Sequence, residues 1–199
     1  MSTAEPLPAR RGRPGYDRDG MLAAAVAVFN EQGYDATSVS ALAGRLGVSK
    51  AALYHHFSSK EELLGAALDH ALDGLEGTLT APRAGGAAEH LAGVLHDAVI
   101  VLAERLPEVT LLLRVRGNSE VERRALDRRR AFDQAVGALV QRAQAEGAVR
   151  ADVDAAVAAR LLFGTVNSLV EWYRPEGPEG AETLARDVVA VALDGLRTR

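Results

Sequence analysis

Apolar side chains recur every three or four residues through most of the chain, and short stretches rich in glycine or proline interrupt them. This period places apolar side chains on one face of a helix, whereas a half-buried strand would alternate at every second residue. The pattern predicts helices over residues 17–32, 39–46, 50–56, 60–79, 87–105, 107–116, 119–146, 154–173 and 181–196, with residue 152 as an alternative start for the eighth. We therefore expect an all-α fold of about nine helices.

The stretch from residue 37 to residue 63 is the most informative part of this pattern. Val39, Leu42 and Leu46 share one helix face, Gly47 follows the last of them, and Ser49 precedes a second short helix. Serine is a favoured N-cap residue, and glycine accepts the left-handed backbone that often ends a helix. Two short helices joined by a tight turn form a helix-turn-helix, whose second helix enters the DNA major groove. The pattern therefore predicts a DNA-binding head.

Two serines further along the chain each precede a glutamate by three residues. They are Ser59 with Glu62 and Ser119 with Glu122. This spacing predicts a capping box, in which the serine hydroxyl accepts the backbone N–H of the glutamate while the carboxylate reaches back to the N–H of the serine. The helices that follow should therefore begin at these serines.

Roughly the first 70 residues also carry a family-specific set of residues. They are Gly33, Tyr34, Thr37, Ser38, Val39, Leu42, Ala43, Gly47, Val48, Ser49, Leu53, Tyr54, His56, Phe57, Ser59, Lys60, Glu61 and Leu63. With them the segment resembles the DNA-binding domain of the TetR family of one-component repressors. One position departs from that family, which usually carries an acidic residue where this chain has Ala41. We therefore expect the first helix of the motif to be less well capped, by about 0.5–1 kcal/mol.

The second helix of the motif should turn its polar and small side chains outward, while Leu53 packs inward. Lys50 is the only long cation in its first turn, so we expect it to read guanine O6 and N7. The resemblance implies phosphate contacts for Tyr54 and His56, completed by Lys60 and by the cap hydroxyls; the alternative is that the two rings only pack the head. The DNA-contact candidates are Thr37, Ser38, Ser49, Lys50, Ala51, Ala52, Tyr54, His55, His56 and Lys60.

Residues 1–16 contain three prolines and two glycines and are expected to form a disordered arm. Arginines on such an arm can reach into a narrow, electronegative minor groove, which makes Arg11 and Arg13 further DNA-contact candidates. The alternative is a solvated tail that only raises the local positive charge.

The net charge of −4 is unfavourable for a DNA-binding protein, but the charge is unevenly distributed. Residues 1–60 hold seven Lys and Arg against five Asp and Glu, whereas the remainder holds 16 against 22. The absence of cysteine excludes disulfides, thiolate metal sites and a cysteine nucleophile. No apolar run approaches the roughly 20 residues of a membrane span, and the N-terminus shows no apolar signal core, so we expect a cytoplasmic protein without a membrane partner.

The resemblance implies an effector pocket inside the body, between the helix at residues 60–79 and the next three helices. Nothing in the sequence marks this pocket as sharply as the head, and an ordinary core is the better explanation for any one of its apolar residues. His96, Arg116 and Asn167 could hold a polar ligand head, and Asn167 could instead hydrogen-bond within a dimer interface. The pocket candidates are Leu68, His96, Val99, Leu102, Leu113, Arg116, Phe132, Phe163 and Asn167.

The C-terminal third carries a second resemblance. Its residues Gly147 to Asp154, Leu162 to Asn167 and the string Trp172-Tyr173-Arg174-Pro175 are similar to the body of TetR-family regulators of fatty acid and sterol degradation. Those regulators are released from DNA by acyl-CoA thioesters, so the resemblance implies an acyl-CoA effector. An uncharged lipophilic molecule is the alternative.

A dense group of basic residues lies on the helix at 119–146, and a nucleotide phosphate of CoA could use it. It comprises Arg123, Arg124, Arg128, Arg129 and Arg130. The competing interpretation is a solvated helix face on which these arginines pair with Glu120, Glu122, Asp127 and Asp133.

The last two helices carry small and apolar residues suited to close helix packing, and doubling such a pair by a two-fold axis makes a four-helix bundle. A homodimer would also supply the two heads that a palindromic DNA operator needs. The interface candidates are Leu161, Leu162, Thr165, Leu169, Val188, Val191, Ala192 and Gly195.

The sequence shows no nucleophile elbow, phosphate loop or Glu-x-x-His repeat, so we expect neither an enzyme nor a cofactor. His55 and His56 are not expected to bind metal, because adjacent helical residues point about 100° apart and no third ligand is nearby. A DNA-binding architectural protein without a ligand remains an alternative to the repressor. The expected organisation is an arm at 1–16, a helix-turn-helix domain at 17–62 and a ligand-binding and dimerisation domain at 63–199.

Overall fold

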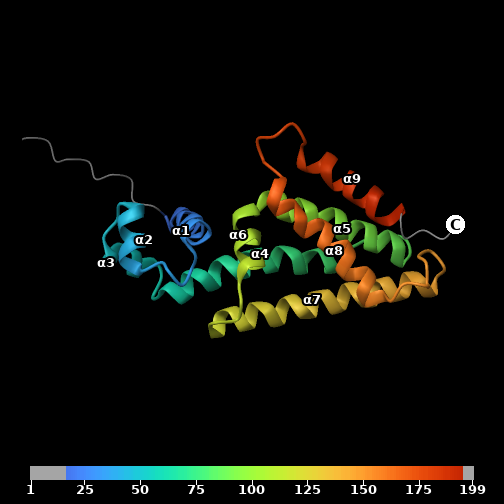
Figure 1. The fold of residues 1–199 in the computed structure, drawn as a ribbon, viewed down its shortest axis with the longest axis horizontal. Coiled ribbons are helices and arrows are strands. Elements are labelled where there is room, and N and C mark those ends of the chain that lie inside the picture. The colour runs from blue at the N-terminus through green and yellow to red at the C-terminus, as the bar shows by residue number, and fades with distance from the viewer. Residues whose placement is uncertain (1–16, 195–199) are drawn as a thin grey trace, which may run out of the picture.

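The computed structural model describes residues 17–194, and within them the chain forms nine α-helices and no strand. The helices are α1 (Arg18–Gln32), α2 (Val39–Leu46), α3 (Lys50–His56), α4 (Lys60–Thr80), α5 (Ala87–Glu104), α6 (Leu106–Arg114), α7 (Glu120–Ala145), α8 (Ala155–Trp172) and α9 (Ala181–Asp194). Figure 1 shows α1 to α3 gathered into a head at one end, with α4 running from this head into a larger body. The expected all-α fold is confirmed.

The helix ends agree closely with the hydrophobic pattern and its caps. Asp154, rather than Asp152, begins the eighth helix, because its carboxylate accepts the backbone N–H groups of Ala156 and Val157 at 3.0 Å each. Pro107 lies in the first turn of α6, where its missing N–H costs nothing.

The two capping boxes form with one change from the expectation. The Ser59 hydroxyl accepts the N–H of Glu62 at 3.0 Å, as predicted. The Glu62 carboxylate, however, accepts the backbone N–H and the hydroxyl of Ser58, both at 2.7 Å, and these bonds lower the pKa of Glu62. Similarly, Glu122 accepts the N–H of Asn118. In both boxes the glutamate carboxylate thus accepts the backbone N–H of the residue before the serine.

The head is held together by apolar side chains from all three of its helices. Phe29 of α1, Leu42 of α2, and Leu53 and Phe57 in and after α3 are all buried. Between α2 and α3, Gly47 adopts a left-handed φ of 66°, which a β-carbon would disfavour. The tight turn between the two motif helices therefore depends on this glycine.

The body is a layered helical bundle around α4 and α5. In it α4 packs against α5, α6 and α7, while α7 packs against α8 and α5 packs against α9. The core is mainly aliphatic, with buried Tyr173 and one aromatic pair, Phe132 of α7 and Phe163 of α8, whose ring centroids are 5.0 Å apart in an edge-to-face arrangement.

The head contacts the body through α6 as well as through α4. The Asn30 amide donates to the carbonyl of Pro107 at 2.8 Å, and Arg114 donates to the carbonyl of Asn30 at 2.9 Å. The amide of Asn118 donates to the Asp35 carboxylate at 3.1 Å. The domain boundary that we expect after residue 62 falls within the first turn of α4, and it stays a prediction.

Candidate nucleic-acid interface

The helix α3 presents the outward face that the sequence predicts. Leu53 is fully buried, whereas Tyr54 is 49% exposed and the side chains around it are open to solvent. The exposed residues of this face are Ser49, Lys50, Ala51, Ala52, Tyr54 and His55, and His56 is partly buried. The face is therefore free for a duplex, and its individual DNA contacts stay predictions.

Two of the predicted contact hydroxyls cap the helices of the motif. Ser38 accepts the N–H of Ala41, and Ser49 accepts the N–H of Ala52, each at 3.1 Å. Both serines are exposed. A capping hydroxyl uses its oxygen as acceptor and keeps its O–H free to donate, so both can still reach a phosphate.

The prediction for Thr37 is wrong in this structure. Its side chain is buried, at 1% exposure, and its hydroxyl donates to the carbonyl of Gly33 at 2.7 Å. Thr37 therefore closes the turn after α1 and offers no hydroxyl to DNA.

Lys60 lies differently from the expected phosphate contact. Its ammonium donates to the carbonyls of Tyr34 and Thr37, both at 2.9 Å, and sits 4.1 Å from the centroid of the Tyr34 ring. Two of its three donors are thereby used inside the head. Lys60 ties the start of α4 to the turn between α1 and α2.

Tyr34 is held neutral by its surroundings. Burial, followed by the charges of Glu61, Glu122 and Asp35, raises the pKa of Tyr34 to about 12.

The rings of His55 and His56 pack edge to face, with centroids 5.3 Å apart, and no cluster in residues 17–194 could hold a metal ion.

The apolar pocket candidates lie together inside the body. Leu68, Val99, Leu102, Phe132 and Phe163 are all buried, and Leu113 is partly buried against the same core. They come from α4 to α8, so the structure brings these candidates into one interior.

Two of the three polar pocket candidates lie elsewhere, and for them the prediction is wrong. His96 bridges α5 and α9 at the surface, 3.1 Å from the Asp97 carboxylate and 3.2 Å from that of Glu182. Arg116 is exposed and borders a pocket of about 310 Å³ between the head and α6. Asn167 remains on α8, partly buried.

The arginines of α7 are largely paired, although mostly not with the predicted partners. Arg128 contacts Asp69 at 2.8 Å, Asp73 at 2.6 Å and Glu76 at 2.8 Å, all on α4, and these bonds raise the pKa of Arg128. Arg124 also reaches Asp69, at 3.5 Å. The signal in the sequence was the acidic stripe on α4, which recurs at helical spacing and faces the arginines.

The pairs within α7 follow the competing interpretation more closely. Arg123 pairs with Glu120 at 2.9 Å, and Arg130 pairs with Asp127. Arg129 has no hydrogen bond or ion pair within the part of the chain that the structure describes, and its charge acts on Asp133.

The structure corrects the dimer candidates. Leu162, Leu169 and Val188 are 3%, 1% and 7% exposed and pack into their own core, so they are wrong as interface residues. The helices α8 and α9 each have one face against the core and another face outward. Periodicity alone does not say which face is which.

The outward face of α8 and α9 carries other large apolar side chains. Leu161 is 65% exposed, Trp172 52% and Val191 76%, and Thr165 lies on the same exposed side of α8. Ala192 is partly buried, while Gly195 and the arm residues Arg11 and Arg13 lie outside the described residues.

A helix-turn-helix head with an exposed second helix, joined to a helical body, defines a DNA-binding transcriptional regulator. Two family models match the chain: "Bacterial regulatory proteins, tetR family" over residues 21–67 and "Tetracyclin repressor-like, C-terminal domain" over residues 84–196. The chain belongs to the TetR family of transcriptional regulators.

Relatives span nearly the whole chain. SCO3833, a TetR-family regulator from Streptomyces coelicolor, is 51% identical and matches with a TM-score of 0.84, over 89% of this chain and 91% of that one. The transcriptional repressor KstR2 of Mycolicibacterium smegmatis is 29% identical over 198 residues, 92% of each chain. AibR, solved in complex with isovaleryl coenzyme A and operator DNA, is 23% identical and shares the fold with a TM-score of 0.73, over 87% of this chain and 96% of that one.

The residues from 17 to 194 include no helix that is both long enough and apolar enough to cross a bilayer.

Proposed function

We propose that this protein is a homodimeric repressor that binds a palindromic operator and is released from it by a fatty acyl-CoA or related CoA thioester. The observation that carries the DNA-binding part is the free outer face of α3, held on a head whose Leu53 is completely buried. A face that is rigidly supported and unpaired suits insertion into a major groove.

On this face, Lys50 is the residue that recognises the base sequence of the operator. It lies in the first turn of α3, is exposed, and has no hydrogen bond or ion pair within residues 17–194. A free ammonium at this position can donate to guanine O6 and N7. Ala51 and Ala52 offer methyl groups to thymine, while the phosphate contacts and arm contacts are assigned to Ser38, Ser49, Tyr54, His55, His56, Arg11 and Arg13.

The exposed apolar face of α8 and α9 supplies the dimer contact. Leu161, Trp172 and Val191 are each more than half exposed on these two helices, which supports a face that becomes buried against a second copy of the chain. A two-fold axis across this face pairs the two helices with their copies in a four-helix bundle. The two heads could then enter successive major grooves about 34 Å apart.

The body supplies the effector site. Its interior around Phe132 and Phe163 is apolar and touches α4, so an acyl chain inserted there would push on the helix that carries the head. AibR, which shares this fold, binds isovaleryl coenzyme A. An apolar interior of this kind is compatible with a thioester, and also with an uncharged lipophilic ligand.

A charged ligand head needs cations near the same helices. A groove of about 320 Å³ between α7 and α8 is lined by Asp133, Gly137 and Arg160. The charges of Arg129 and Arg160 both act on Asp133, whose pKa burial raises. Arg160 lines this groove and the charge of Arg129 acts on the same Asp133, which favours these two arginines as partners for the phosphates of CoA.

The experiment titrates operator release with acyl-CoAs of several chain lengths, free fatty acids and CoA alone, on an operator selected from random DNA. We expect release by acyl-CoA only. A tenfold loss of DNA affinity requires about 1.4 kcal/mol of coupling between the two sites. The variant Arg129→Gln should bind the operator normally but respond more weakly, whereas Arg130→Gln, whose arginine is already paired, is the matched control.

Release by free acids but not by thioesters would reject the CoA thioester. Release by an uncharged lipophilic compound, unaffected by either arginine variant, would favour the alternative effector. Light scattering that shows a monomer at micromolar concentration would reject the dimer.

A further inference from the structure

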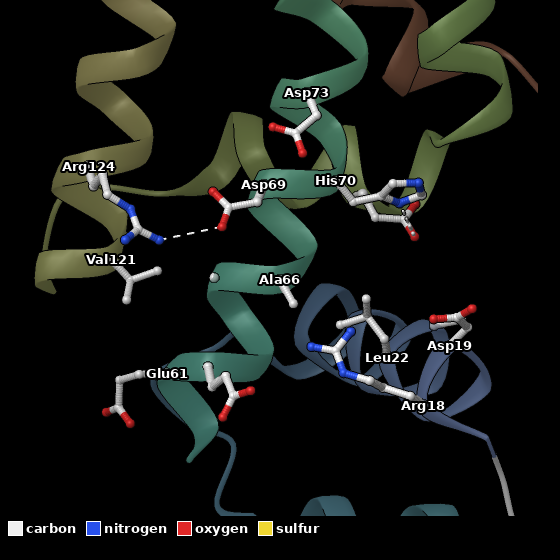
Figure 2. Close-up of a pocket in the computed structure, with 14 residues that line it drawn as sticks. Arg18, Asp19, Leu22, Glu61, Ala66, Asp69, His70, Asp73, Val121 and Arg124 are labelled. Atoms are coloured by element: carbon white, nitrogen blue, oxygen red, sulfur yellow. Dashed lines mark hydrogen bonds and ion pairs between the residues drawn. The ribbon is translucent and has the colours of Figure 1, made fainter. Parts of the chain in front are cut away.

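A second large concavity lies on the side of the molecule where the head meets the body. Figure 2 shows this cleft between α1, α4 and α7. Glu108 of α6 also lines it. Its volume is about 790 Å³, and neither the DNA contacts nor the acyl-chain interior uses it.

The cleft is rich in carboxylates. Six acidic side chains line it, against two arginines and one histidine. Asp69 and Asp73 are neutralised by arginines of α7. Asp19 of α1 and Glu61 of α4 are exposed and have no hydrogen bond or ion pair within residues 17–194. These two carboxylates lie on different helices and on opposite sides of the cleft (Figure 2), so a segment with several basic residues can reach both, one at each side.

The floor of the cleft is apolar. Leu22, Ala66 and Val121 lie between the charged groups, as Figure 2 shows. An apolar floor with carboxylates around it suits arginine side chains, because their stems pack on apolar surface while their guanidinium groups reach the charges.

The chain itself carries a segment with this chemistry. Residues 1–16 include Arg10, Arg11 and Arg13, together with Leu7 and three prolines. Arg18 lines the cleft, so the segment joins the described chain at the cleft wall. Five residues of extended chain span about 17 Å, which brings Arg13 within reach of the carboxylates.

We propose that the N-terminal segment of residues 1–16 docks in the acidic cleft of its own chain when the protein is not on DNA. Its arginines pair with Asp19 and Glu61, and its apolar residues cover Leu22 and Val121. Because the segment is tethered beside the cleft, its effective concentration there is far higher than that of a free basic peptide. The same arginines cannot occupy the cleft and a minor groove at once, so docking competes with operator binding.

The experiment measures the docking directly in the DNA-free, full-length protein. The natural chain has no cysteine, so Ala9→Cys gives a single attachment site for a nitroxide spin label. We expect strong paramagnetic broadening of the amide signals of Ala66 and Val121, and little at Ala190 on α9. The broadening should fall at least twofold in 0.5 M NaCl, because salt screens exposed ion pairs.

The decisive comparison uses two double variants with the same change in charge. Asp19→Asn with Glu61→Gln should reduce the broadening at Ala66 to the level of Ala190. Glu104→Gln with Glu179→Gln, which neutralises two exposed carboxylates outside the cleft, should leave it unchanged. Equal broadening at all positions, or broadening that survives neutralisation of the cleft, would overturn the proposal.

Two further outcomes would also overturn it in favour of another occupant. Broadening at Ala66 in isotope-labelled protomers that carry no spin label, observed in mixed dimers with spin-labelled partners, would assign the cleft to the partner's arm. Spermidine-induced shifts of the Ala66 and Val121 amides without any effect from the label would assign it to a free polyamine.

Discussion

Replacing Lys60 by methionine tests whether this lysine serves the fold or the DNA. The substitution keeps most of the apolar stem and removes the ammonium, which donates to the carbonyls of Tyr34 and Thr37 at 2.9 Å. A hydrogen bond from a charged donor contributes about 1.5–3 kcal/mol, and a cation over an aromatic ring about 0.5–1 kcal/mol at exposed sites. Lys60 is partly exposed, so water would replace part of the loss, and we expect about 2–3 kcal/mol of destabilisation.

Thermal unfolding at fixed protein concentration measures this loss. In a chain of this length each kcal/mol corresponds to roughly 2–4 °C, so the Tm should fall by about 4–12 °C. Lys50→Met is the matched control, because Lys50 is exposed and unpaired within residues 17–194. Its Tm should change little, while its operator affinity should fall by about 1–3 kcal/mol.

The salt dependence of operator binding separates the two roles of Lys60. Each phosphate contact that is lost lowers the slope of log K against log salt by about 0.9, which makes about 1.8 for a dimer. The structure predicts an unchanged slope for Lys60→Met, measured well below its Tm. An unchanged Tm together with a smaller slope would refute the internal role and restore Lys60 as a phosphate contact.

Three further perturbations follow from the structure. Gly77→Ala should stabilise the protein by up to about 1 kcal/mol, because nothing lies within 4 Å of the added β-carbon. Gly74→Ala should destabilise it, because a side-chain carbon of Val101 lies 2.8 Å from the added β-carbon. Urea unfolding measures both changes. Because the pKa of Tyr34 is raised to about 12, the stability that neutral Tyr34 contributes is complete below pH 10 and is lost between pH 10 and 12. Absorbance at 295 nm should show one tyrosine that ionises late, and Tyr34→Phe should remove this signal. Ala41→Glu should complete the capping box of α2. It should raise the free energy of unfolding by about 0.5–1 kcal/mol, which a slightly higher Tm would show.

The helices and their ends could be predicted because local signals determine them. Ser49 caps α3, Gly47 takes the left-handed φ, and Asp154 begins α8, each through contacts within a few residues. Leu53 is inward and Tyr54 outward for the same reason, because the period of a helix fixes their directions relative to the neighbouring core.

The errors arose where long-range packing decides the role of a side chain. Thr37 and Lys60 both lie near the motif, but they turn inward to satisfy carbonyls at the end of α1 and in the following turn. For Arg128 the partners are 52 to 59 residues away on α4, and nothing within α7 reveals them. Leu162 was assigned to the wrong face of α8 because that helix has two apolar faces, one for its own core and one outward.

The connection between head and body explains how a modest ligand effect could control DNA binding. Outside the continuous helix α4, α1 packs against α6, and the hydrogen bonds between head and body are those of Asn30 to Pro107 and Arg114 and that between Asn118 and Asp35. Each such bond has a net value of about 0.5–1.5 kcal/mol, and a tenfold change in affinity needs only about 1.4 kcal/mol. An effector that shifts α6 enough to break one or two of these bonds therefore has sufficient leverage over the position of α3, without any unfolding of the head.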